Sequence, residues 1–180
     1  MKAFLPLLAV ALALPAAAQT PQPAEAAALE YIAAMQSADW DRTAALTHPE
    51  ALVELKNVFA MLAQVDTAGE MLRPYFGVSD DVEFDRLRPT EVYARLMRHL
   101  ASDPLVSQAM RSLRAEVVGS IPEGADTVHV LYRMHTQLEE TRVRKLEILS
   151  LRRAGDRWLA LLTGDLRGLA DSITGAIGAP

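Results

Sequence analysis

The sequence predicts an α+β fold in which N-terminal helices pack on a mainly antiparallel sheet of four or more strands, followed by a C-terminal helix. Apolar residues recur at helical spacing before residue 111, and they alternate with polar residues in four stretches between 112 and 163. The chain has 180 residues, of which 51% are hydrophobic, enough to build the core of one domain.

The first 18 residues have the pattern of a secretory signal peptide. Met1 and Lys2 form a short positive segment, residues 4–14 are apolar, and residues 16–18 are alanines suited to cleavage. The apolar run is shorter than a helix that spans a bilayer, which disfavours the alternative of a membrane anchor. We therefore expect a leader over residues 1–18, a mature domain over 19–180 without a membrane span, and a periplasmic location.

The composition excludes several classes of protein. The chain has no cysteine, which rules out disulfides, thiol nucleophiles and thiolate metal sites. Its net charge of -5, with 23% charged residues, differs from that of a basic nucleic-acid-binding domain. We expect no nucleic-acid partner and no cofactor.

The segments before the sheet are assigned to helices by their apolar stripes, caps and prolines. Asp39 is expected to cap a short helix, and Thr47 with Glu50 has the spacing of a capping box for the next one. Pro49 and Pro89 fall in first turns, where proline is well tolerated. The predicted helices cover residues 24–37, 40–46, 48–65, 89–100 and 105–110.

Residues 70–88 contain Tyr75, Phe76 and Phe84, whose rings need to be buried. A lid over a cavity and a packed irregular crossover both fit, and the crossover is the preferred interpretation. Asp80 is a candidate cap for a helical turn that contains Phe84. Trp40 has two interpretations as well, first as a core residue at a helix junction and second as part of a pocket.

Four strands are predicted at residues 112–119, 127–136, 142–152 and 158–163. Residues 122–124 (Pro-Glu-Gly) are a turn signal between the first two strands, and Gly155 with Asp156 predicts a tight hairpin before the last. In the second strand, the face expected to meet the first helix has Val128, Val130, Tyr132 and Met134. The other face has His129, Leu131, Arg133 and His135.

The last strand is apolar on both faces, which predicts a position in the middle of the sheet with cover on each side. A second subunit is the preferred cover for the face that the helices do not occupy, so we expect a homodimer through the sheet. The apolar stripe of a predicted helix at 166–177 is the alternative cover.

The capped helices at Asp39-Trp40 and residues 47–50, and the later hairpin at residues 155–158 (Gly-Asp-Arg-Trp), resemble the nuclear-transport-factor-two-like superfamily. That superfamily includes ketosteroid isomerase and scytalone dehydratase, and the resemblance covers residues 24–163. It implies a curved sheet wrapped around the first helix, a cone-type domain and a conical pocket. Its members include enzymes, ligand binders and assembly modules, so the resemblance does not decide the function.

Three functions fit this prediction. The preferred one is binding of a small apolar or amphipathic ligand, with Tyr31, Trp40, Tyr75, Tyr93, Tyr132 and Met134 as candidate contacts. The second is a small lyase or isomerase, which needs a carboxylate base and a neutral donor such as tyrosine. Asp41, Glu116 and Glu147 are candidate carboxylates, but no spacing pairs one with a tyrosine. Glu147 is interpreted first as a partner of Lys145 or of a cross-strand arginine on an outer face, and second as a residue that points into a pocket. The third is a structural module that dimerises through the sheet.

Two further features of the sequence are a pair of histidines on one strand and a group of basic residues. His129 and His135 lie about 20 Å apart along an extended strand, too far to bind one ion, so no metal is expected. Arginines and a lysine gather on two adjacent strands at positions 142, 144, 145, 152 and 153. A solvated face is the preferred interpretation of this patch, and contact with an anionic lipid or polymer is the alternative.

Overall fold

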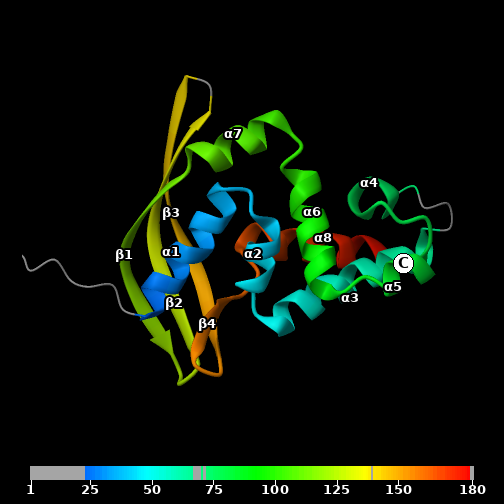
Figure 1. The fold of residues 1–180 in the computed structure, drawn as a ribbon, viewed down its shortest axis with the longest axis horizontal. Helices are drawn as coiled ribbons and strands as arrows, with labels where there is room; N and C mark the ends of the chain where they lie inside the picture. Colours follow the sequence, from blue (N-terminus) through cyan, green and yellow to red (C-terminus); the bar gives the residue numbers. More distant parts are fainter. Residues whose placement is uncertain (1–22, 67–69, 71, 139, 179–180) are drawn as a thin grey trace, which may run out of the picture.

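The described helices lie to one side of a four-stranded antiparallel sheet (Figure 1). The computed structural model describes residues 23–66, 70, 72–138 and 140–178, so the predicted leader over residues 1–18 lies outside the described residues. The strands follow the chain order: β1 (Arg114–Glu123), β2 (Thr127–Leu138), β3 (Thr141–Ala154) and β4 (Arg157–Ala160). The predicted α+β class, with helices first and a helix last, is confirmed.

The longer helices lie close to their predicted positions: α1 (Pro23–Gln36), α2 (Trp40–Ala45), α3 (Pro49–Val65), α6 (Pro89–Leu100), α7 (Pro104–Ser112) and α8 (Gly164–Gly178). As expected, Asp39 caps α2, because its side chain accepts a hydrogen bond from the Arg42 N–H at 3.0 Å. Within the described part of the chain, none of the helices has the length and apolar character needed to cross a bilayer.

The cap of α3 differs from the prediction. His48 rather than Thr47 is the N-cap, and its Nδ1 accepts a hydrogen bond from the Glu50 N–H at 3.3 Å. The Thr47 hydroxyl instead donates to the Thr43 carbonyl at 2.9 Å, at the end of α2. Thr47 therefore belongs to the junction between the two helices and does not form the predicted capping box.

The stretch after α3 contains two short helices, α4 (Leu72–Phe76) and α5 (Asp81–Asp85). The ring of Phe76 lies 4.9 Å from that of Phe59 and 5.2 Å from that of Phe84, and all three rings are buried. Asp80 caps α5 by accepting a hydrogen bond from the Glu83 N–H at 2.8 Å. The structure thus agrees with a packed crossover and not with a lid.

Two apolar clusters form the core. The first joins the helices α2 to α6 with the start of α8, and Leu55 and Tyr93 are among its buried residues. The second lies between α1 and the sheet, and it includes Tyr31, Val130 and Leu149. Val130 of β2 has no exposed surface and lies in this cluster, so the β2 face predicted from alternation to meet the first helix is the inner face of the sheet.

The predicted position of the last strand is wrong. β4 is an edge strand, and it ends at Ala160 rather than at residue 163. Its free edge is covered by the link between α2 and α3: the Ala160 N–H donates to the Leu46 carbonyl at 2.8 Å, and the His48 N–H donates to the Ala160 carbonyl at 2.7 Å. Leu161 and Leu162 pack in the helical cluster. The apolar residues of this stretch therefore have cover within the chain and do not require a second subunit.

The boundaries of β1 and the position of α8 also differ from the predictions. Ser112 belongs to α7, and β1 continues through Pro122 and Glu123, which were predicted as part of a turn. The turn follows them at Gly124, whose φ of 68° lies in the region that favours glycine. α8 packs along α3 rather than on the outer face of the sheet, so the predicted alternative cover is wrong.

Candidate ligand-binding cavity

A cavity of about 380 Å³ lies between α1, α7, the inner face of β2 and β3, and the start of α8. Its apolar wall includes Ile32, Met35, Val106, Ala109, Met110, Leu113, Met134, Val143 and Leu149. The volume lies in the range of small-molecule sites, which are mostly apolar with a few polar groups that orient the ligand. The curved sheet lies beside α1 (Figure 1). These two elements position the cavity, because side chains of alternate strand residues pack in one cluster with those of α1.

The structure brings three of the six predicted contact residues to this cavity: Tyr31, Tyr132 and Met134. Tyr93 is not in the wall, but its hydroxyl is hydrogen-bonded to that of Tyr31 at 2.7 Å.

The other two predicted contacts lie elsewhere. Trp40 is buried in the helical cluster, which agrees with its first interpretation as a core residue. Tyr75 is 37% exposed on α4, and its ring centre lies 4.5 Å from that of His99. Neither residue lines the cavity.

One group of polar residues lines the cavity on the strand side. Tyr132 on β2 is directly opposite Glu147 on β3, and residues paired in this way have Cβ atoms about 5 Å apart. The Glu147 carboxylate also accepts from the Lys145 ammonium at 2.7 Å. Asp165, in the first turn of α8, lines the same cavity. The cavity thus has an apolar body and a group of polar residues that comprises the Tyr132 phenol, the Lys145 ammonium and the two carboxylates, and Thr136 and Thr163 also line it.

The Tyr132 hydroxyl stays protonated at neutral pH. Burial, followed by the charges of Glu147, Tyr31 and Asp165, raises the pKa of Tyr132 to about 12. This hydroxyl has no hydrogen-bond partner within the described chain. It can therefore donate a hydrogen bond to an oxygen of a bound molecule.

Behind the cavity wall, the Tyr31 and Tyr93 hydroxyls form a buried pair. Burial is the main cause that raises the pKa of Tyr31 well above its ordinary value, and the neighbouring Tyr93 acts in the same direction. Burial also raises the pKa of Tyr93. Both groups are protonated at neutral pH, so this pair anchors α1 to α6 and holds the Tyr31 ring against the cavity.

Sequence reasoning did not place Lys145 or Asp165 at the cavity, and it gave Glu147 a position in a pocket only as the second interpretation. The prediction that Glu147 pairs with Lys145 is confirmed, but it placed the pair on an outer face. Strand alternation could have placed Glu147 correctly. Residues two positions apart point to the same face of a sheet, and Leu149 is buried on the inner face. No sequence pattern predicts that α7 lines the cavity, because this depends on how that helix packs against the sheet.

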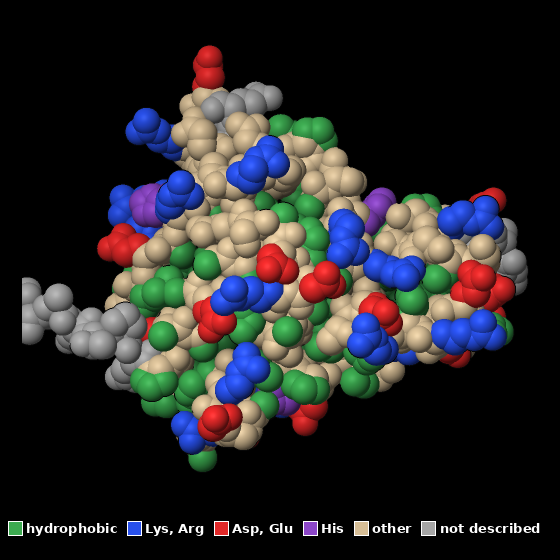
Figure 2. All heavy atoms as spheres, in the orientation of Figure 1, with side chains coloured by type: hydrophobic (Ala, Val, Ile, Leu, Met, Phe, Trp, Pro, Cys, Tyr) green, Lys and Arg blue, Asp and Glu red, His purple; other side chains and the backbone are tan. Residues whose placement is uncertain are grey.

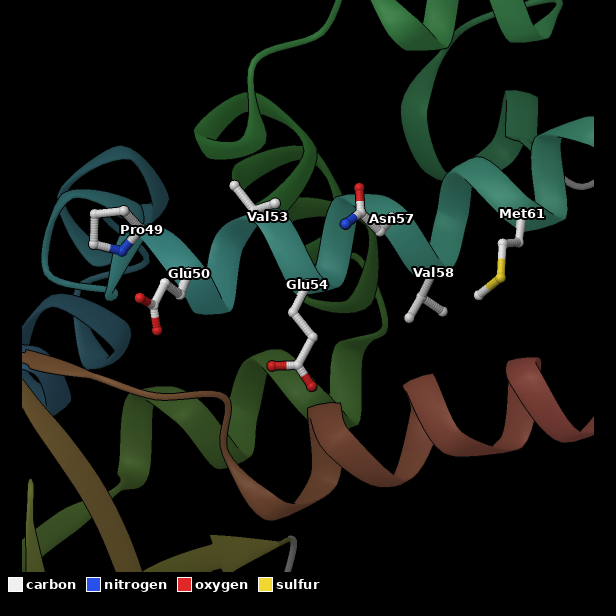
Figure 3. Close-up of a pocket in the computed structure, with 7 residues that line it drawn as sticks. All are labelled: Pro49, Glu50, Val53, Glu54, Asn57, Val58 and Met61. Atoms are coloured by element: carbon white, nitrogen blue, oxygen red, sulfur yellow. The ribbon is translucent and has the colours of Figure 1, made fainter.

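A larger hollow, of about 550 Å³, runs along the surface of α3 (Figure 3). All of its lining residues belong to that helix: Pro49, Glu50, Val53, Glu54, Asn57, Val58 and Met61. Its two carboxylates already have cationic partners, Arg152 for Glu50 at 2.8 Å and Arg167 for Glu54 at 4.0 Å. An open groove on one helix with paired charges is a weaker candidate than the cavity under α1.

Across the residues that the structure describes, no three His, Asp or Glu side chains are grouped to bind a metal ion. His129 is engaged on both ring nitrogens, with the Ser150 hydroxyl at 2.9 Å and the Glu123 carboxylate at 2.7 Å. Its polar contacts therefore belong to the surface of the sheet and not to a shared site with His135.

Comparison with known proteins gives no independent assignment. The chain matches no protein-family model, no curated protein and no solved structure. The resemblance to the nuclear-transport-factor-two-like superfamily therefore stays a prediction, and the function has to be argued from the cavity itself.

Proposed function

We propose that the protein binds a small apolar or amphipathic molecule in the cavity between α1 and the sheet. The supporting observation is the Tyr132 hydroxyl, which lines a mostly apolar cavity beside Lys145, Glu147 and Asp165 and has no hydrogen-bond partner within the described chain. A ligand with an apolar body and an oxygen acceptor at one end matches this arrangement. We also propose a periplasmic location, which is supported by the predicted leader over residues 1–18.

Mass spectrometry can test this proposal. The purified full chain is measured under native conditions and again after organic extraction, and an added mass that extracts as a small molecule is the expected result. Ala109→Phe should remove it, because Ala109 lines the cavity and a ring there fills the space. Ala26→Phe, at an exposed position on α1, is the matched control and should retain it. No retained mass, together with no calorimetric binding of decanol, contradicts the proposal.

A small lyase or isomerase is the second candidate, and the opposition of Tyr132 and Glu147 favours it. A protonated tyrosine can stabilise an oxyanion while a carboxylate removes a proton from carbon. Ligand binding remains the first choice because Lys145 already occupies a Glu147 oxygen at 2.7 Å. Deuterium exchange at the α-carbons of cyclohexanone, followed by NMR, tests the alternative: the exchange should slow in Glu147→Gln. A rate equal to that of buffer alone argues against catalysis of this kind.

Fewer observations support the predicted homodimer than support ligand binding. The dimer was predicted because apolar residues on both faces of the last strand need cover. The α2–α3 link and the helical cluster cover these residues, so they do not require a second subunit. Exposed aliphatic residues on the outer sheet face are the remaining observation in its favour. Sedimentation velocity of the purified chain at micromolar concentration tests it: a dimer would support a second subunit, and a monomer would contradict it.

A further inference from the structure

The outer face of the sheet is not covered by any of the described helices (Figure 1). Its residues follow from the strand register, which places Arg114, His135 and Arg144 side by side in one row across β1, β2 and β3. The next row toward the β2–β3 hairpin pairs Gln137 with Arg142. In Figure 2, several Lys and Arg side chains lie along the sheet side of the molecule, at the upper left of the view, and others lie over the helices. One end of the face is therefore rich in cations.

Most of these cations have no ionic partner. Arg114, Arg142 and Arg144 are exposed, and none of them pairs with a carboxylate within the described chain. The exception in the neighbouring row is Arg133, which contacts Glu116 at 3.2 Å. Unpaired arginines are well suited to phosphate oxygens, which they can bind through two parallel hydrogen bonds.

A hollow of about 320 Å³ opens at the same end of the sheet. It is lined by Ser112, His135, Thr136, Gln137, Arg142, Val143 and Arg144. Two arginines thus line a space that is large enough for a small polar head group. An acceptor-rich anion in this space would meet Arg142 and Arg144 together.

Exposed aliphatic residues continue from the arginines along the same face. Ile121 is 65% exposed, Leu146 56% and Ile148 58%, and Val118 is also exposed. In the register, Leu146 is opposite Arg133, and Ile148 is opposite Leu131 in the following row. A basic end and an aliphatic region lie next to each other on one uncovered surface, the pattern of a surface that binds at a lipid interface.

We propose that this outer face docks on a bilayer that contains anionic phospholipid. The arginines contact phosphate groups at the hairpin end, and the aliphatic side chains enter the boundary between head groups and acyl chains. Without Arg152, which is paired with Glu50 of α3, the face has four arginines (114, 133, 142 and 144) and two glutamates (116 and 123), a balance of +2, in a chain of net charge -5. Two copies placed face to face would bring like charges together, so an anionic surface is a better occupant than a second copy.

Vesicle sedimentation tests this proposal. The full chain is mixed with vesicles of equal parts phosphatidylglycerol and phosphatidylcholine, or of phosphatidylcholine alone, and the two partition coefficients are compared. We expect stronger binding to the anionic vesicles, and Arg142→Glu with Arg144→Glu should reduce it by about tenfold or more. The control, Arg73→Glu with Arg86→Glu, changes the net charge equally at exposed positions on the helical side and should alter binding less than twofold. All variants have the same first 18 residues, so any binding by that segment cancels in the comparison.

Several results would overturn the proposal. Equal binding to both kinds of vesicle, or an equal loss in both charge-reversal variants, would remove the role of this face. Absence of binding to anionic vesicles would do the same. A dimer that dissociates in Ile148→Asp, in a chain that does not bind vesicles, would assign the face to a second copy. The cavity proposal survives each of these outcomes, because its test depends on Ala109 and on extracted ligand.

Discussion

The hydroxyl groups of Tyr31 and Tyr93 lie 2.7 Å apart, at the boundary between the two apolar clusters of the core. Tyr31 belongs to the cluster between α1 and the sheet, whereas Tyr93 belongs to the helical cluster. The two residues are separated by 62 positions in the chain. Their hydrogen bond is a buried polar link between the two clusters, which also share apolar contacts such as those of Met35. Its loss should report how strongly the two halves depend on each other.

We expect Tyr31→Phe and Tyr93→Phe each to lower the free energy of unfolding by about 1–2 kcal/mol, because each change takes a buried partner from the remaining hydroxyl. The loss of unfolding free energy in the double variant should be smaller than the sum of the two single losses, because neither tyrosine hydroxyl remains to lack its partner. Urea unfolding of the four proteins measures this coupling. Strictly additive losses would show that the two hydroxyls act independently.

Alkaline pH should destabilise the protein through its buried tyrosines. The folded-state pKa of Tyr132, about 12, is raised above the ordinary value of 10.0. The contribution of a raised pKa is complete below pH 10 and is lost as the pH rises through about 12. Tyr31 and Tyr93 act in the same direction. Tyr132→Phe should therefore reduce the fall in stability between pH 10 and 12, measured as the urea midpoint, and an identical fall in both proteins would exclude Tyr132 as a cause.

Local patterns in the sequence were sufficient for most of the fold. The period of two along β2 correctly separated Val130 from His129, because one sheet face is buried and a one-residue slip would invert it. The position of β4 could not be predicted in this way. Its edge is covered by Leu46 and His48, more than a hundred residues earlier in the chain, and no local pattern encodes that contact.

The cavity was predictable only in part, for a similar reason. Tyr132 and Met134 follow from strand alternation next to the first helix. Tyr75 was included because of its residue type alone, and residue type does not determine where a side chain lies. Asp165 reaches the cavity because α8 begins beside the strands, which depends on tertiary packing.

The register of β3 can be tested with two neighbouring residues. Leu149 is 2% exposed on the inner face and Ile148 is 58% exposed on the outer face. Leu149→Ala should cost about 2–5 kcal/mol of unfolding free energy, because it leaves a cavity in the core. Ile148→Ala should change stability by no more than about 0.5 kcal/mol. Urea unfolding measures the free energy of both variants. A larger loss in Ile148→Ala than in Leu149→Ala would show that Ile148, and not Leu149, points to the inner face.

The packed crossover after α3 makes a final prediction that separates stability from binding. Phe84 has no exposed surface and lies 5.2 Å from Phe76, so Phe84→Ala should cost about 3–5 kcal/mol. Val82, 56% exposed on the same short helix, is the matched control, and Val82→Ala should have little effect. At a temperature where Phe84→Ala is still folded, its affinity for decanol should equal that of the unaltered chain, because Phe84 does not line the cavity. A selective loss of affinity in Phe84→Ala would instead indicate that this crossover acts as a lid.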